Sequence, residues 1–252
     1  MPHPRIEKIR LDRLLVDRAL AESREKAQGL ILAGQILVND QKVDKCGALV
    51  DAQSSLRMLG EAPKYASRAG LKLEGALAHF RVDLDGTVCL DVGSSTGGFT
   101  DCLLQHGAGK VFAVDAGTNQ LDWKLRRDPR IVVLEQTNAR FLGKNLINTP
   151  VDIVTIDVSF ISATLILPAL PPLMAIPAQI IVLVKPQFEV GKGQVGKGGI
   201  VRDPALHQEA VAKVSRKLLE LGFTQLASVE SPLPGAEGNH EFFLHAVWPK
   251  AR

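Results

Sequence analysis

Short apolar runs, separated by longer mixed segments, are the feature that most constrains the fold of this chain. Seven such runs follow residue 87, and the stretches 111–114, 131–134 and 180–184 within them are apolar without interruption. Uninterrupted runs are typical of strands that are buried on both faces, as in parallel sheets covered by helices. The sequence therefore predicts an α/β fold, a Rossmann-like, doubly wound, mostly parallel sheet. The expected strands are residues 88–92, 111–115, 131–135, 151–157, 180–185, 224–231 and 241–248.

Helices are expected in most of the connections between these strands. One covers residues 71–80, ahead of the first strand, one begins at Gly98, and one covers residues 204–221. The connections after the second, third and fourth strands are each expected to contain a helix as well. A loop at residues 232–240 joins the last two strands, which are expected to form an antiparallel pair at one edge of the sheet.

The first part of the chain, from about residue 5 to residue 59, has a different pattern. Apolar residues between Ile9 and Leu20 recur at helical spacing, and Ser23 is a suitable N-cap for a second helix that stops at Gly34. A strand at residues 35–38, turn residues 39–40 and an alternating run up to Val50 follow, which indicates a helix–helix–β-hairpin unit. We expect a small N-terminal α/β domain at residues 1–60, a linker at 61–66 and a large domain at 67–252.

The first strand of the large domain ends in a Gly-rich turn, Asp91-Val-Gly-Ser-Ser-Thr-Gly-Gly-Phe99. Glycine lets the backbone approach a ligand, and the helix that follows offers unpaired N–H groups. Asp91 would repel a pyrophosphate, but it suits a ligand with an amino group and a sulfonium. Asp115 is placed to accept a ribose diol, and Asn138 to bond an adenine edge. The set predicts S-adenosylmethionine as the cofactor. The expected cofactor-binding residues are Asp91, Gly93, Ser94, Ser95, Thr96, Gly97, Gly98, Phe99, Asp115, Asn138 and Asp157.

A second Gly-rich segment, residues 191–198, reads GKGQVGKG and nearly matches a phosphate-binding P-loop. A P-loop requires Ser or Thr after its lysine to hold magnesium, but Gly198 follows Lys197, and no helix follows at once. The segment is better interpreted as a flexible basic loop over the active site that touches RNA backbone.

Composition and charge exclude several classes of protein. The three cysteines, Cys46, Cys89 and Cys102, do not match the spacing of a zinc site, so no metal is expected. Their scatter suits a reducing compartment, and the charged N-terminus does not resemble a signal peptide, so we expect a cytoplasmic protein. Residues 161–184 are uncharged, which raises a membrane span, but four prolines interrupt them. We expect a short helix, a turn and a buried strand there instead.

Polar residues stand at the ends of the expected strands. Asp157 ends the fourth strand, Lys185 the fifth, and Glu241 begins the last. Ligands of open α/β sheets bind at the carboxyl ends of the parallel strands, so these side chains should converge there. Lys72, on the helix that precedes the sheet, is placed to close the same site.

The N-terminal unit resembles the S4-type RNA-binding module. The resemblance covers the run RLDRLLVDRALAESREKAQGLILAGQILVNDQKVDK, from the Leu-Asp-x-x-Leu opening to Val38-Asn39. It implies that a basic helix face meets RNA phosphates. The residues expected to contact RNA are Arg10, Arg13, Arg18, Arg24, Lys26 and, in the large domain, Arg68.

The rest of the chain resembles the FtsJ-type ribose methyltransferases, and nearly the whole sequence resembles the TlyA family of rRNA methyltransferases. The matching segments are SRAGLKLEGAL, DVGSSTGGFTD, TNAR, DVSFIS, VKPQFEVGKGQVGKGGIVRDP and SPLPGAEGNHEFFL. The resemblance implies 2′-O-methylation of cytidine in rRNA, with rRNA or a ribosomal subunit as the partner and a catalytic tetrad of Lys72, Asp157, Lys185 and Glu241. We expect Lys185 to take or stabilise the proton of the 2′-hydroxyl, Asp157 and Glu241 to tune it, and Lys72 to orient the hydroxyl.

Two other functions remain open at this point. Members of the resembling family often bear the label hemolysin, and the uncharged stretch at 161–184 is the support for a membrane-active cytolysin. A non-catalytic ribosome-binding protein is the other alternative. The chain also lacks a long C-terminal helix after its last strand. In the family this implies large-subunit rRNA as the substrate.

Overall fold

The chain folds into two compact units, Met1–Ala62 and Pro63–Arg252. The computed structural model describes residues 8–59, 63–235 and 238–249. The second unit therefore begins at Pro63, earlier than the expected residue 67, and takes in most of the expected linker. Residues 61 and 62 of that linker lie outside the described residues, as does the start of the N-terminal unit at residue 5.

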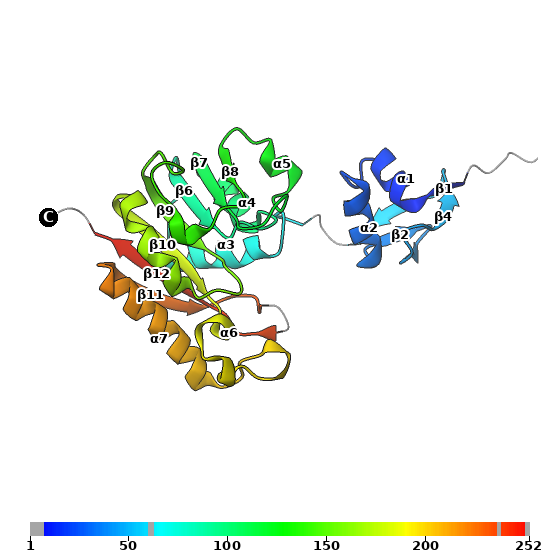
Figure 1. Cartoon of the computed structure of the whole chain (residues 1–252). Coiled ribbons are helices and arrows are strands. Elements are labelled where there is room, and N and C mark those ends of the chain that lie inside the picture. The colour runs from blue at the N-terminus through cyan, green and yellow to red at the C-terminus, as the bar shows by residue number, and fades with distance from the viewer. Residues whose placement is uncertain (1–7, 60–62, 236–237, 250–252) are drawn as a thin grey trace, which may run out of the picture. The chain divides into compact units, whose positions relative to one another are not determined.

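The N-terminal unit is a small α/β domain (Figure 1). Ser23 caps its second helix as predicted, since Ser23 Oγ accepts a hydrogen bond from the backbone N–H of Lys26 at 3.2 Å. Asn39 and Asp40 both have positive φ, which suits the tight hairpin between β2 and β3. The elements are β1 (Lys8–Arg10), α1 (Leu11–Asp17), α2 (Arg24–Leu32), β2 (Ile36–Val38), β3 (Gln41–Lys42), β4 (Leu49–Asp51) and β5 (Leu56–Met58). Its buried core is Leu11, Leu15, Ala21, Ala27, Ile31, Ile36 and Val38.

Two expectations for this unit were wrong in detail. Ile9 belongs to a strand rather than to the first helix, and it pairs with Val50 of β4. The run up to Val50 is not one hairpin arm, because β3 pairs with β2 while β4 pairs with β1. Strands of two or three residues are too short for alternation of polar and apolar residues to reveal them.

The second unit contains a seven-stranded sheet in the order β11-β12-β10-β9-β6-β7-β8. Among the described strands of this sheet, β12 alone runs against its neighbours, and the other pairs are parallel. The predicted doubly wound sheet and the antiparallel pairing of the last two strands are therefore confirmed. The strands are β6 (Val88–Val92), β7 (Lys110–Val114), β8 (Ile131–Leu134), β9 (Val151–Ile156), β10 (Met174–Val184), β11 (Thr224–Glu230) and β12 (Phe242–Trp248).

Helices and turns cover both faces of this sheet (Figure 1). Helices α3 (Ala69–Phe80) and α4 (Gly98–Gln105) bury Leu73, Leu77 and Leu103 with Cys89 and Ile181 on one face. Helix α7 (Pro204–Glu220) buries Val214 and Leu218 with Leu90 and Ile180 on the other. Adjacent residues of one strand thus enter different cores, as the alternation of side chains in a strand requires.

Three of the expected connecting helices are shorter than expected or are replaced by 3₁₀ turns. The connection after β7 holds the four-residue helix α5 (Trp123–Arg126), and the one after β8 holds only the 3₁₀ turn η1 (Ala139–Phe141). The connection after β9 consists of 3₁₀ turns, because prolines interrupt it. Those turns are η2 (Ala163–Leu165), η3 (Leu167–Ala169) and η4 (Pro171–Leu173). A short helix α6 (Pro186–Glu189) follows β10, and 3₁₀ turns η5 (Lys192–Gln194) and η6 (Lys197–Gly199) precede α7.

The uncharged stretch at residues 161–184 is part of this fold. It forms the turns η2 to η4 and then β10, which lies inside the sheet between β9 and β12. Within the part of the chain that the structure describes, no helix combines the length and apolar character needed to cross a membrane.

Candidate active site at the carboxyl ends of the strands

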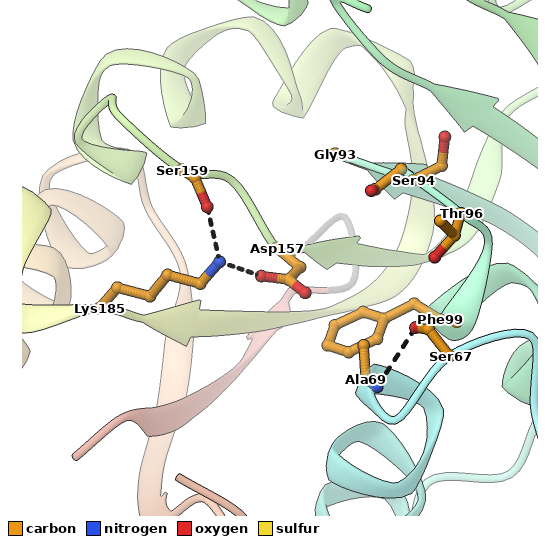
Figure 2. A pocket seen from close by; sticks show the side chains of 11 residues that line it. Ser67, Ala69, Gly93, Ser94, Thr96, Phe99, Asp157, Ser159 and Lys185 are labelled. Carbon is orange, nitrogen blue, oxygen red and sulfur yellow. Dashed lines mark hydrogen bonds and ion pairs between the residues drawn. The ribbon is translucent and has the colours of Figure 1, made fainter. Parts of the chain in front are cut away.

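The ends of β9 and β10 bring a carboxylate and a lysine into direct contact (Figure 2). Asp157 directly follows β9, and Lys185 directly follows β10. Lys185 Nζ lies 2.5 Å from Asp157 Oδ1 and donates a hydrogen bond to Ser159 Oγ at 3.1 Å. The exposed fractions of the two charged side chains are only 12% and 17%. The pair is therefore partly shielded from water while it still reaches an open cavity.

Lys72 and Glu241 form a second ion pair, which is more deeply buried. Lys72 Nζ lies 2.6 Å from Glu241 Oε2, and their side chains are 8% and 2% exposed. Glu241 reaches this edge because β12 is antiparallel: Val184 pairs with Phe242, so the continued register sets Lys185 beside Glu241. The four residues expected to act together thus form two ion pairs. Asp157 and Lys185 line a cavity, whereas Lys72 and Glu241 are not among its lining residues.

The Gly-rich turn after β6 closes against the end of β9. Gly93 and Gly97 have φ of +87° and +96°, a backbone conformation that favours glycine. A Cβ added at Gly93 would lie 2.3 Å from the backbone oxygen of Asp157. Helix α4 starts directly after Gly97, so its unpaired N–H groups face the same region. The cavity of about 180 Å³ at this turn is lined by Ser67, Ala69, Gly93, Ser94, Ser95, Thr96, Gly98, Phe99, Asp157, Ser159 and Lys185.

A larger cavity of about 540 Å³ continues from the first one, since both are lined by Gly93, Ser95, Asp157 and Ser159. Its other lining residues include the polar groups Asp115, Thr137 and Asn138 and the apolar side chains of Val114, Val158, Ile161 and Ile166. This combination suits a ligand with a flat ring and a diol, bound between apolar walls with a few placed polar groups.

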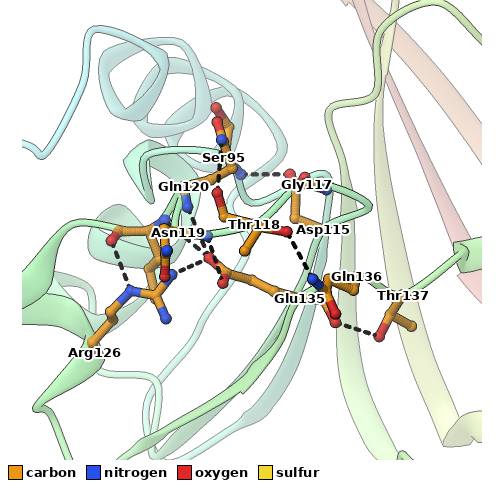
Figure 3. Close-up of polar contacts among 11 residues, drawn as sticks. Ser95, Asp115, Gly117, Thr118, Asn119, Gln120, Arg126, Glu135, Gln136 and Thr137 are labelled. Atoms are coloured by element: carbon orange, nitrogen blue, oxygen red, sulfur yellow. Dashed lines mark hydrogen bonds and ion pairs between the residues drawn. The ribbon is translucent and has the colours of Figure 1, made fainter.

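Asp115 organises the backbone around this larger cavity (Figure 3). Its carboxylate accepts hydrogen bonds from the backbone N–H of Ser95 at 2.9 Å and of Gly117 at 2.7 Å. The loop that follows is held by Glu135, whose carboxylate accepts bonds from the backbone N–H of Asn119, Gln120 and Leu121. Asp115 therefore connects the Gly-rich turn to the loop after β7, and both border the cavity.

Asp91 occupies a different position from the one expected for a ligand contact. It is completely buried and accepts hydrogen bonds from Thr100 Oγ1 at 2.7 Å and Thr155 Oγ1 at 2.9 Å. Burial raises the pKa of Asp91 to about 7, although the two threonine hydrogen bonds oppose the rise. Neither cavity is lined by this residue. Asn138 does line the larger cavity, where its side-chain oxygen accepts a bond from the backbone N–H of Arg140.

Ser67, Ser159 and Phe160 are among the residues of this site that sequence reasoning missed. Phe160 is 91% exposed and lines the larger cavity. Its ring centroid lies 5.3 Å from that of Phe188, and its backbone φ is +65°, which is rare for a bulky side chain. The sequence signal that could have identified Phe160 is its place directly after the strand-end Asp-Val-Ser, because a large aromatic side chain there lies outside the buried strand.

The basic residues of the N-terminal unit are held by internal contacts. Asp12 is fully buried and accepts hydrogen bonds from Arg10, Arg24 and Gln28. The hydrogen bonds with Arg10 hold the pKa of Asp12 well below its usual range. Arg10 and Arg24 still expose 48% and 54% of their side chains. A phosphate thus has access to both guanidinium groups.

The other expected RNA contacts differ in how they are anchored. Arg18 donates to the backbone oxygens of Ala52 and Ser54, and Arg13 lies 3.7 Å from Asp17. Lys26 and Arg68 are exposed.

The loop that resembles a P-loop does not have the structure of one. It forms η5 and η6 instead of leading directly into a helix, and α7 begins only at Pro204. Its end is fixed by the buried side chain of Asn239, whose Nδ2 donates to Gly199 O and whose Oδ1 accepts from Val201 N. Asn239 stands two residues before Glu241, so the loop is tied to the chain that carries the buried ion pair.

Comparison with known proteins agrees with this architecture. Residues 65–248 match the model of the FtsJ-like methyltransferases, and residues 9–54 match the S4 domain. The chain belongs to the FtsJ-like methyltransferase family. The chain combines an S4 domain with an FtsJ-like methyltransferase domain, which is the pair of domains that its resemblance to the TlyA family implies. That resemblance is therefore confirmed.

Individual relatives of this FtsJ-like methyltransferase cover nearly its whole length. The 16S/23S rRNA (cytidine-2′-O)-methyltransferase TlyA of Mycobacterium tuberculosis is 48% identical over 93% of this chain and 88% of that protein. Hemolysin A of Brachyspira hyodysenteriae is 41% identical over 95% of this chain and 100% of that protein. The solved structure named as a putative hemolysin from Streptococcus thermophilus superposes with a TM-score of 0.75 at 41% identity, over 98% of this chain and 90% of that one.

Proposed function

We propose that this protein uses S-adenosylmethionine to methylate the ribose 2′-hydroxyl of a cytidine in rRNA. The observation that carries the proposal is the Asp157–Lys185 pair in the wall of the smaller cavity, with Asp157 also lining the larger cavity that continues from it. One cavity and its polar lining suit the cofactor, and the strand ends beside it leave room for a second reactant. The relatives named as rRNA methyltransferases supply the substrate class.

The residues that line the cavities fit the cofactor by their chemistry. Asp115 is placed to accept hydrogen bonds from ribose hydroxyls, and the walls formed by Val158 and Ile161 suit the adenine ring. Asn138 and the backbone N–H groups of the Gly-rich turn are the remaining polar contacts, and Asp157 suits the amino group. We assign Asp91 a supporting role, because it holds Thr100 of α4 and Thr155 of β9 together beneath the turn.

The bound cofactor supplies a methyl group on a positively charged sulfur. Transfer of that methyl group to oxygen would break its bond to sulfur, and the sulfur would leave as a neutral thioether. The 2′-hydroxyl would lose its proton in the same step, and we assign Lys185 to take or stabilise this proton. Asp157 and Ser159 fix the position of Lys185 Nζ. The buried Lys72–Glu241 pair lines neither cavity, so we assign it a positioning role. The continued register of β10 and β12 sets Glu241 beside Lys185, through which the pair acts on the site. General-base help of this kind contributes about 10²–10⁴-fold, and the in-line alignment of the reacting atoms contributes the rest.

The S4 unit supplies affinity for RNA, with Arg10, Arg13, Arg18, Arg24 and Lys26 as the proposed contacts and Arg68 as one more in the second unit. These contacts fix register and orientation and do not read sequence. The exposed ring of Phe160 at the cavity suits a single-stranded or flipped base, which RNA-binding proteins often hold by stacking on an aromatic side chain. Because the proposed substrate is rRNA, we place the protein in the cytoplasm, where rRNA is accessible.

The decisive experiment incubates the purified protein with radiolabelled S-adenosylmethionine and each ribosomal subunit from cells that lack the protein. We expect label in RNA and a new 2′-O-methylcytidine after digestion to nucleosides, and mapping then identifies the subunit and the position. The variant K185M should transfer no detectable methyl group while it binds the cofactor and rRNA normally. Label on a base, label absent from both subunits, or an active K185M variant would each contradict the proposal.

A membrane-lytic function is not supported by the fold. The uncharged stretch that suggested it provides turns and the strand β10 of the sheet. Leakage of dye from lipid vesicles by the pure protein would be the sign of such an activity.

A further inference from the structure

Glu189 is a buried carboxylate next to the site, and the mechanism above does not use it. It ends α6, the helix that begins directly after Lys185. Its side chain is only 3% exposed. A buried carboxylate is stable only when its oxygens are paired, so its contacts indicate what it does.

Both oxygens of Glu189 hold the connection that follows β9. Oε1 accepts a hydrogen bond from the backbone N–H of Ala163 at 2.7 Å, and Oε2 accepts one from Ser162 Oγ at 2.5 Å. Lys213 of α7 lies 3.1 Å from Oε2 and also donates to the backbone oxygen of Glu189 at 2.6 Å. One carboxylate thus joins the helix after β10, the turn after β9 and the helix that covers them.

The segment held in this way, residues 157–163, carries the chemistry of the site. It contains Asp157 and Ser159, which contact Lys185 Nζ, and Phe160, which lines the larger cavity. Phe160 has a positive φ, a strained conformation that persists only where its surroundings enforce it. The carboxylate of Glu189 and the ring of Phe188, both on α6, are the contacts that hold this segment from one side.

We propose that Glu189 is a positioning residue that fixes segment 157–163 against α6 and thereby sets the geometry of Lys185, Asp157 and Ser159. This inference rests on the proposed methyl transfer, since it assigns Glu189 to the same reaction. Glu189 does not touch the reacting atoms. It acts through Ser162 and Ala163, and a shift of about 1 Å at the site is enough to cost on the order of 100-fold in rate.

The test compares E189A, E189Q and S162A with the control E220Q in the full-length protein. Glu220 is 64% exposed and pairs with Lys217 on the same helix as Lys213, so its loss removes a carboxylate of α7 without changing the segment. We expect E189A to lower kcat for methyl transfer by about 10- to 100-fold while KM for rRNA changes less than threefold. E189Q keeps an acceptor for the Ala163 N–H and should retain more activity than E189A.

Two further readouts separate positioning from a general loss of stability. Backbone hydrogen exchange of residues 158–164 should be faster in E189A than in E220Q, at a temperature where both are folded. The pH profile of kcat should differ from that of the wild type in E189A and in S159A but not in E220Q, because the first two changes alter the surroundings of Lys185 Nζ, directly in S159A and through the segment in E189A. If E189A does not fold, S162A removes one of the same hydrogen bonds and is expected to give a smaller change in both readouts.

The inference is overturned if exchange in residues 158–164 and the pH profile of kcat match those of E220Q in each folded variant. Backbone hydrogen exchange can be measured whether or not the protein transfers a methyl group. If the unmodified protein transfers no methyl group to rRNA, the proposed function fails, while faster exchange in E189A would still support the positioning of the segment.

Discussion

Replacing a single residue of this protein should change the free energy of unfolding by very different amounts at different positions. The largest effect is expected at the buried Lys72–Glu241 pair. Both charges are nearly inaccessible to water and contact each other at 2.6 Å. Replacing one partner leaves the other charge buried without compensation, which typically costs about 3–5 kcal/mol, whereas replacing both by neutral residues of similar shape costs much less.

We therefore expect K72M to lower the free energy of unfolding by about 3–5 kcal/mol and the double variant K72M/E241Q to recover a large part of that loss. Urea unfolding of the wild type, the two single variants and the double variant measures the coupling. The exposed pair Arg57–Asp40, at 61% and 82% side-chain exposure, is the matched control, and R57M should change stability by less than about 1 kcal/mol. Additive effects of K72M and E241Q would contradict this prediction.

Asp91 should make stability depend on pH in an unusual direction. Burial raises its pKa to about 7 in the folded chain, while an unfolded aspartate titrates near pH 3.9. Between these values the folded chain holds a proton that the unfolded chain has released. Stability from this group is therefore present in full below about pH 4 and is lost as the pH rises through about 7.

The asparagine side chain of D91N cannot ionise, so this variant should not lose stability at this site as the pH rises. The free energy of unfolding of the wild type, relative to D91N, should fall by about 2–4 kcal/mol from pH 4 to pH 8. Urea unfolding at both values measures the difference. T100V removes a hydrogen bond that lowers the pKa of Asp91, so it should extend the decline to higher pH and enlarge its total. A relative stability that rises with pH would contradict the assignment.

At the scale of elements, two glycines on either side of β6 show why the turn after this strand requires glycine. Backbone conformation is one reason, and close approach of another part of the backbone is the other. Gly86 and Gly93 both have positive φ, +67° and +87°. A Cβ at Gly86 would meet no atom within 4 Å, whereas a Cβ at Gly93 would lie 2.3 Å from the backbone oxygen of Asp157. The two positions therefore separate backbone strain from steric collision.

We expect G86A to cost only the strain of a left-handed residue, about 1–2 kcal/mol of stability, with unchanged affinity for S-adenosylmethionine. G93A must in addition displace Asp157, so its affinity for the cofactor should fall at least about tenfold. Calorimetric titration of both folded variants with the cofactor provides the measurement. Equal affinities in G86A and G93A would show that the turn tolerates a side chain.

The elements also show what sequence alone can establish. The central strands of the large sheet were predictable because burial on both faces gives them apolar runs, as in β7 and in residues 180–184 of β10. Asp157 and Lys185 were predictable as neighbours because the ends of adjacent parallel strands meet. The turns η2 to η4 and the strand β1 were not, since their segments are too short for a periodic pattern. The support given by Glu189 and the internal position of Asp91 depend on side-chain contacts that spacing does not reveal.

At the scale of the whole molecule, the position of the domain boundary has a physical basis. Tyr65 is 3% exposed within the core of the second unit, and the backbone N–H of Ala66 donates to Asp101 Oδ2 at 2.8 Å. A Cβ added at Gly70 would lie 2.4 Å from the ring of Tyr65, so α3 is shaped to receive that ring. These residues belong to the fold of the second unit, although the sequence assigned them to a linker.

Two fragments should therefore behave differently. The fragment 63–252 should fold and bind S-adenosylmethionine with the affinity of the full chain, because it keeps its own core and all the residues that line both cavities. The fragment 67–252 lacks Tyr65 and should be less stable by about 3–5 kcal/mol, the usual cost of removing a large buried aromatic side chain. Thermal and urea unfolding of the two fragments compares them directly, and equal stability would place the boundary at 67.

The same fragment 63–252 tests the division of labour between the units. Without the basic residues of the S4 unit it should bind rRNA more weakly, and its affinity should depend less steeply on salt, because fewer phosphates are neutralised. The dependence is obtained by measuring rRNA binding of the fragment and of the full chain between about 50 and 200 mM salt. An unchanged slope would mean that the second unit alone carries the phosphate contacts, and the arginines of the N-terminal unit would then serve only their own fold around Asp12.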